Sequence, residues 1–206
     1  NGDGTFSDVA EESGVSGDAW STGAAFADYD ADGDLDLYVA SYVDLTDSEG
    51  QEEVPPLGPC TWRGLEVFCG PDGLTPASDV LYLNDGLEEG FSFSDMGESW
   101  GIRETGPYFG LGVLAVDFDD DGDPDIYVAN DSQPNLLLRN HGHGHRQRLI
   151  DVAVEAGVAH SADGRNQAGM CVASSDCDGD GDLDLLVTNF SHDYNALYRN
   201  RGDGTF

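Results

Sequence analysis

Apolar and acidic segments alternate along the chain, and the same order of segments occurs three times. Residues 35–41, 124–130 and 183–189 each place one aspartate among aliphatic, aromatic and β-branched side chains, with turn residues on both sides. Short apolar runs of this kind between turns are typical of β-strands. No segment shows the sustained apolar spacing of an amphipathic helix, so the pattern predicts an all-β protein.

Alignment of the acidic segments reveals a repeating unit of four predicted strands. The first strand precedes the acidic segment, the second follows it, and a Gly-rich turn separates the third from the fourth. First strands are predicted at 23–27, 112–116 and 171–175, third strands at 79–85, 134–140 and 195–200, and fourth strands at 5–10, 91–97 and 148–154. Four short strands per unit are typical of propeller blades, whereas a β-sandwich, the alternative all-β fold, does not explain the repetition.

The unit boundaries predict a β-propeller fragment of about three four-stranded blades. Its predicted parts are the last strand of a preceding blade at 1–14, a blade at 21–100 with an insertion at 44–79, a second blade at 108–157, and a third, incomplete blade at 166–206. Propellers close with about four to eight blades. The remaining blades of the same chain are therefore expected to cover the apolar faces of the outer units.

Each acidic segment reads D-x-D-x-D-G-D-x-D and begins at residue 28, 117 or 176. Carboxylates this close repel one another unless a cation lies between them. The glycine at the sixth position (Gly33, Gly122 or Gly181) permits a sharp turn. The first, third and fifth side chains can then converge, the ninth can close the group, and the seventh residue can offer its carbonyl oxygen. The candidate metal ligands are Asp28, Asp30, Asp32, Asp34, Asp36, Asp117, Asp119, Asp121, Asp123, Asp125, Asp176, Asp178, Asp180, Asp182 and Asp184.

A ligand set of oxygen atoms alone favours calcium, because magnesium retains its waters and zinc prefers His or Cys. We expect about one Ca²⁺ per acidic loop, three in this chain. An EF-hand would need a glutamate at the twelfth position and flanking helices, but that position holds Val39, Val128 and Val187, each in a predicted strand. A solvated turn without an ion is the simpler alternative, although it requires neither a glycine nor five acids in fixed register.

The three acidic segments, followed by "LYLND", "LLLRN" or "LYRN" and by turns such as "NGDGTF", resemble FG-GAP/VCBS repeats, the calcium-loop blades of integrin-α-like propellers. The segment "PCTWRGLEVFCGPDGL" adds a resemblance to the ASPIC/UnbV-associated, cartilage-acidic-protein-like group. The resemblance implies a secreted, periplasmic or cell-surface protein that binds calcium between the first two strands of each blade. It assigns the ligand role to the aspartates above, with Asp34, Asp123 and Asp182 acting through the main chain.

Acidic residues number 41 and basic residues 8, which gives a net charge of −33. This balance argues against nucleic-acid binding, and the lack of a long apolar run argues against membrane insertion. Because no nucleophile elbow or catalytic triad is apparent, the sequence favours a non-catalytic, calcium-binding module that acts in protein or glycan binding or adhesion. The alternative is the scaffold of a polysaccharide hydrolase or lyase, in which Trp62 and Arg63 of the insertion would cover a cleft.

The four cysteines form two unlike pairs. Cys60 and Cys69 lie in the insertion, where a disulfide is favoured over a two-cysteine metal site because no histidine lies nearby in the sequence. Cys171 and Cys177 are separated by six residues of extended chain, about 20 Å, so they cannot bridge each other. They are expected to be buried thiols.

Two short motifs also have simpler explanations. His141, His143 and His145 alternate with glycines in a turn where copper or zinc could bind, but a solvated hairpin is favoured because such flexible imidazoles are poorly preorganised. The tripeptide at 201–203 matches an adhesion motif. The corresponding turn at 1–3 reads Asn-Gly-Asp, however, so a hairpin turn is favoured.

Overall fold

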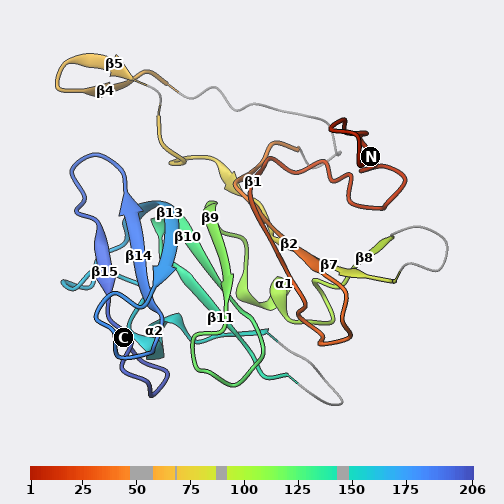
Figure 1. The fold of residues 1–206 in the computed structure, drawn as a ribbon. Coiled ribbons are helices and arrows are strands. Elements are labelled where there is room, and N and C mark those ends of the chain that lie inside the picture. Colours follow the sequence, from red (N-terminus) through yellow and green to blue (C-terminus); the bar gives the residue numbers. More distant parts are fainter. Residues whose placement is uncertain (47–57, 68, 87–91, 143–148) are drawn as a thin grey trace.

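The computed structural model describes residues 1–46, 58–67, 69–86, 92–142 and 149–206. The described chain is nearly all β and contains several antiparallel sheets, which confirms the predicted fold class of an all-β propeller fragment. Three sheets follow one another along the chain and lie side by side, from the first blade on the right of Figure 1 to the third on the left. His143 and His145 lie outside the described residues.

The strands of the three sheets match the predicted first, second and third strands, with ends that differ by a few residues. The first blade contains β1 (Ser21–Ala27), β2 (Asp36–Ser41), β7 (Val80–Asn84) and β8 (Phe93–Asp95). The second blade contains β9 (Gly110–Val116), β10 (Asp125–Gln133), β11 (Leu136–Asn140) and β12 (Leu149–Asp151). The third blade contains β13 (Gln167–Ser175), β14 (Asp184–Asn189) and β15 (Ala196–Tyr198).

Each acidic loop connects the first strand of a blade to the second, and the ninth aspartate is the first residue of that second strand. In all three blades the first and second strands pair antiparallel directly across the loop, as Ala27 with Asp36 shows in the first blade. The three loops consequently lie on the same side of the molecule, at the ends of the strands (Figure 1). The second and third blades are also joined by hydrogen bonding, because Asp131 of β10 pairs with Ala168 of β13.

Two features differ from the predicted strand pattern. Residues 5–10 form no strand, because no described third strand lies beside them to supply hydrogen-bond partners. Two helices, α1 (Ile102–Thr105) and α2 (Ala153–Ala156), follow the fourth strands of the first and second blades. Each helix has only four residues, which is too short to leave a helical period in the sequence. Among the described residues, no helix has the length and apolar character needed to cross a membrane.

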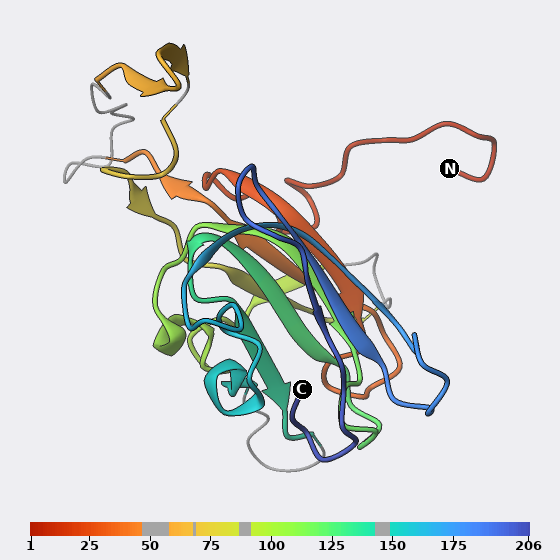
Figure 2. The ribbon, with the colours of Figure 1, turned by 90° about the vertical axis from the view of Figure 1, so that its left-hand side faces the viewer.

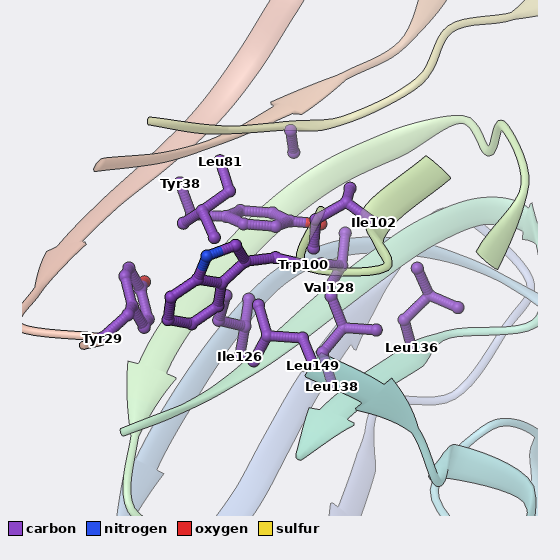
Figure 3. Packing of buried hydrophobic residues seen from close by; sticks show 11 residues of the cluster. Tyr29, Tyr38, Leu81, Trp100, Ile102, Ile126, Val128, Leu136, Leu138 and Leu149 are labelled. Carbon is purple, nitrogen blue, oxygen red and sulfur yellow. The ribbon is translucent and has the colours of Figure 1, made fainter. Parts of the chain in front are cut away.

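The hydrophobic core lies between the blades rather than within one of them. One cluster packs Tyr38 and Leu81 of the first blade against Ile126 and Val128 of the second, with Trp100 at its centre (Figure 3). A second cluster, between the second and third blades, contains Tyr127, Ala129, Leu137, Val172, Leu185 and Val187. The sheet of the second blade is therefore covered on both faces, and all residues from Asp125 to Asp131 are buried.

The insertion forms a small lobe beyond the ends of the strands that lie opposite the acidic loops (Figure 1). β3 (Val43–Asp44) pairs with β6 (Thr75–Pro76) at its base. β4 (Cys60–Trp62) and β5 (Leu65–Val67) form a hairpin at its tip. Cys60 and Cys69 form a disulfide with a Cα–Cα distance of 5.2 Å, which confirms the predicted pairing.

The expectation that Cys171 and Cys177 are buried thiols is wrong, because the structure exposes both. Cys171 lies in β13 on the face of the third blade that no other described sheet covers. Cys177 occupies the second position of the third acidic loop. An alignment of the repeats equates Cys177 with Tyr29 and Phe118, which are buried in the clusters between blades. It equates Cys171 with Gly23 and Gly112, which are only partly buried.

Candidate metal centre

The structure brings three carboxylate groups together in each acidic loop. The members offer oxygen atoms that all lie within 4.8 Å of one another. The three groups are Asp28, Asp30 and Asp32 in the first loop, Asp117, Asp119 and Asp125 in the second, and Asp176, Asp178 and Asp184 in the third. The first and third positions thus converge in every loop, and the third member comes from the fifth position in the first loop and from the ninth in the other two.

Six of the candidate ligands stand outside these three groups. They are Asp34, Asp36, Asp121, Asp123, Asp180 and Asp182. Asp34, Asp123 and Asp182 occupy the seventh position, where the sequence resemblance assigns the ligand role to the main-chain carbonyl rather than to the carboxylate. Asp32, Asp121 and Asp180, at the fifth position, each accept a hydrogen bond from the backbone N–H of that seventh residue. This bond fixes the second half of the loop.

The carboxylate of the first aspartate stabilises the turn of the loop by accepting backbone N–H groups from later loop residues. The carboxylate of Asp28 accepts the N–H groups of Asp32 (3.1 Å) and Gly33 (3.0 Å), and that of Asp117 accepts the corresponding pair in the second loop. The sixth-position glycines have φ values between 96° and 104°, as the predicted sharp turn requires. The fourth position is left-handed as well, at Ala31, Asp120 and Gly179. The sequence analysis missed this second left-handed residue. Only one of the three loops has a glycine at the fourth position, so the sequence signal is weak.

The ninth aspartate has a structural task that the sequence analysis did not foresee. In the second blade, the two carboxylate oxygens of Asp125 accept the N–H groups of Phe118 (3.1 Å) and Asn140 (2.8 Å). Asp36 and Asp184 make the same pair of bonds in the other blades, and all three residues are buried. The ninth position therefore ties the acidic loop to the third strand of its own blade.

Burial and mutual repulsion disfavour the charged form of several loop carboxylates. Burial, with further contributions from Asp36 and Asp32, raises the pKa of Asp30 to about 6. Burial raises the pKa of Asp125 to about 7, against the opposing effect of its two N–H donors. Burial also raises the pKa of Asp119, and its Oδ1 is buried without a hydrogen-bond partner among the described residues. A cation among these groups would relieve both the desolvation and the repulsion.

Arginine side chains reach into two of the three loops. Arg139 Nε lies 3.1 Å from Asp119, and Arg199 forms ion pairs with Asp178 and Asp180. The bond from the N–H of Asp182 and then the contact with Arg199 lower the pKa of Asp180. Leu83 holds the equivalent position in the first blade, so this position supplies no cation to the first loop. The sequence analysis missed these ion pairs. Their signal is the Arg-Asn pair at the end of the predicted third strand in the second and third blades.

The oxygen-rich loops lie at the same ends of the strands in successive antiparallel sheets of three or four described strands, and this arrangement defines the chain as a propeller-type repeat protein. In agreement, the FG-GAP-like repeat family matches residues 1–39, which include β1, the first acidic loop and most of β2. The chain therefore contains an FG-GAP-like repeat. No curated protein matches the chain.

Proposed function

We propose that this chain is a calcium-binding, non-catalytic propeller module of a secreted, periplasmic or cell-surface protein, and that it acts in protein or glycan binding or adhesion. The observation that supports calcium binding is the convergence of three carboxylates in each of three loops. The bound ion would neutralise the loop and fix the connection between the first and second strands. We also propose that the protein is related to the ASPIC/UnbV-associated, cartilage-acidic-protein-like group.

The donor set fits calcium better than other common ions. Every converging side chain is a carboxylate, and no His or Cys belongs to the groups that the described residues form. The unpartnered Oδ1 of Asp119 and the raised pKa of Asp30 and Asp125 are the properties expected of carboxylates arranged for a hard cation. The ligands that we assign to calcium are the aspartates of the three groups, with the seventh-position carbonyls completing each shell.

The surface opposite the acidic loops supports a role in ligand binding. A pocket of about 530 Å³ lies there between the disulfide-closed hairpin and the residues that follow β14. Val67 and Phe190 supply apolar side chains to the pocket, and Thr61 and Ser191 supply hydroxyl groups. Phe190 is 63% exposed, so one aromatic ring is available to a ligand. An apolar and hydroxyl lining suits the face of a sugar ring or a peptide side chain.

Calcium titration by calorimetry tests the metal proposal. We expect heat from about three sites at calcium concentrations between about 10⁻⁵ and 10⁻² M, with little response to magnesium in the same range. Asp30→Asn should remove one site, because Asp30 is one of the three converging carboxylates of the first loop. Asp163→Asn, which changes an exposed aspartate outside the loops, should leave all sites intact. The absence of heat up to about 10 mM calcium would refute the proposal.

Glycan and protein arrays, read with calcium present, test the binding proposal. We expect one class of ligand to be retained and its signal to fall several-fold in Phe190→Ala. Val154→Ala removes a similarly exposed apolar side chain on α2, far along the chain from the pocket, and should leave the signal unchanged. Turnover of a polysaccharide on the same array would instead support the hydrolase or lyase alternative.

A further inference from the structure

In the second and third blades, an arginine near the end of the third strand lies beside the acidic loop. Leu138 and Tyr198 pair with the residues that directly follow the ninth aspartates, and Arg139 and Arg199 come one position later. Regular antiparallel pairing therefore brings both arginines to the same place relative to their own loops.

The residue after each arginine fixes the chain at this point. Asn140 donates from its N–H to Asp125 of its own loop at 2.8 Å, and from Nδ2 to the carbonyl oxygen of Tyr29 in the preceding loop at 2.8 Å. Asn200 makes the corresponding bonds in the third blade, where its Nδ2 donates to the carbonyl oxygen of Phe118 at 2.9 Å. Both asparagines are buried. The backbone that carries each arginine is thus held at two points beside the loops.

Each guanidinium forms an ion pair with the third aspartate of its loop. Arg139 Nε lies 3.1 Å from Asp119 Oδ2. Arg199 pairs with Asp178 and, at 3.2 Å, with Asp180. Asp119 and Asp178 are also members of the converging carboxylate groups. The arginines therefore contact the same carboxylates that we assign to calcium.

Asp119 shows most clearly how one carboxylate can serve two cations. Its Oδ2 contacts Arg139, whereas its Oδ1 is buried without a hydrogen-bond partner among the described residues. Arg139 is also held from its other side, because its Nη2 donates to the carbonyl oxygen of Gly204 at 3.4 Å. Gly204 lies close to the C-terminal end of the chain, which is on the same side of the molecule as the acidic loops (Figure 2). The side chains of Arg139 and Asp119 are only 25% and 19% exposed, so solvent screens their interaction weakly.

We propose that Arg139 and Arg199 are internal counter-ions that reduce the dependence of the second and third loops on calcium and weaken calcium binding there. This inference rests on the proposed calcium binding and concerns its regulation. In the ion-free loop, the guanidinium offsets the repulsion among the aspartates. In the occupied loop, the guanidinium and the ion repel each other across the shared carboxylate. Each arginine thus stabilises the ion-free loop more than the occupied loop, and linkage requires that it lower the calcium affinity by the same factor.

Calcium calorimetry of the protein and its arginine variants tests the inference. We expect the Kd of one site to fall at least about fivefold in Arg139→Leu. Arg199→Leu should lower the Kd of a different site. Leucine is a suitable replacement, because Leu83 stands at the equivalent position of the first blade. Arg139→Lys retains the charge and should keep the Kd close to that of the unaltered protein.

Two controls separate a local effect from a general change in charge. Arg103→Leu also removes one positive charge and one ion pair, that with Asp95 at 2.9 Å, but the pair lies outside the acidic loops. It should leave the Kd values of all sites unchanged. In a protein that already carries Asp119→Asn and lacks the second site, Arg139→Leu should not alter the binding of calcium to the remaining sites.

Melting curves in chelator and in saturating calcium supply a second readout. Arg139→Leu should lower the melting temperature more in chelator than in calcium, because the arginine preferentially stabilises the ion-free loop. A role limited to the contact with Gly204 would lower both melting temperatures equally, and that result would overturn the inference.

The titrations distinguish failure of this inference from failure of the calcium proposal. Unchanged Kd values in both leucine variants would overturn the inference and leave calcium binding in place. Weaker binding in Arg139→Leu would also overturn it, because the arginine would then position Asp119 for the ion. Absence of heat from the unaltered protein would refute the calcium proposal and the inference together. If Arg139→Leu does not fold, the Kd values of Arg199→Leu decide the question.

Discussion

Removal of calcium at pH 7.5 is expected to lower the melting temperature by about 15–30 °C. Each occupied site stabilises the native state by about 2.7 kcal/mol when free calcium exceeds its Kd a hundredfold. For a chain of this size, 1 kcal/mol changes the melting temperature by roughly 2–4 °C. Three independent sites therefore produce an effect of this size. Calorimetric melting with 10 mM calcium and with chelator measures it, and coincident curves would contradict the prediction.

The calcium effect should also depend on pH, with a definite sign. The folded-state pKa values of Asp30 and Asp125, about 6 and about 7, lie above the value of about 3.9 for an unfolded aspartate. Without an ion, the stability that protonation of these groups provides is fully present below about pH 4 and is lost as the pH rises through 6 and 7. The ion-free protein should consequently melt at a higher temperature at pH 5 than at pH 8.

Protons and calcium compete for the same carboxylates, so the stabilisation by calcium should be small at pH 5 and large at pH 8. Asp79 is a control, because burial raises its pKa to about 6 although it lies outside the acidic loops. It accepts the N–H of Ser41, as the side chains of Asn135 and Asn195 accept the equivalent N–H groups of the other blades. Asp79→Asn should therefore fold, and it should reduce the pH dependence in chelator without reducing the calcium effect.

Trp100→Ala should lower the free energy of unfolding by about 3–5 kcal/mol, the usual cost of emptying a large aromatic site in a core. Trp100 is 4% exposed and packs between the first two blades among Tyr38, Ile126 and Leu149 (Figure 3). Its carbonyl oxygen also accepts the N–H of Leu149, which keeps β12 in place. The substitution thus weakens the packing between two blades.

Urea unfolding measures this effect, with Trp20→Ala as the matched control. Trp20 is 51% exposed and makes an edge contact with Tyr42, so its loss should cost much less than the loss of Trp100. Similar midpoints for the two variants would show that the cluster around Trp100 does not connect the blades in the way that the structure indicates.

The strands and the acidic loops were predictable because their signals are local. The alternation around Asp36, Asp125 and Asp184 marks the second strands, and the glycine at the sixth position marks the turn that brings the first and third aspartates together. The disulfide was predictable because the two cysteines of the insertion are close in sequence. Calcium binding, the export of the protein and the absence of catalysis remain predictions.

Contacts between blades were not predictable from the sequence, because they depend on how whole sheets stack. The hydrogen bond from Asn140 to the Tyr29 carbonyl joins residues 111 positions apart, and no local sequence pattern predicts it. The two carboxylate oxygens of Asp125 were likewise assigned only to a metal, although backbone N–H groups occupy both. The exposure of Cys177 was missed for the same reason, because its equivalents Tyr29 and Phe118 are buried by contacts between blades.

The bonds made by Asn140 and Asn200 bear on how such proteins gain or lose units. The second and third blades supply the same donor, and the first and second present the same carbonyl acceptor, so both junctions in the structure use one kind of polar contact. Duplication or deletion of an entire repeat within a gene would thus create a junction that is already complementary.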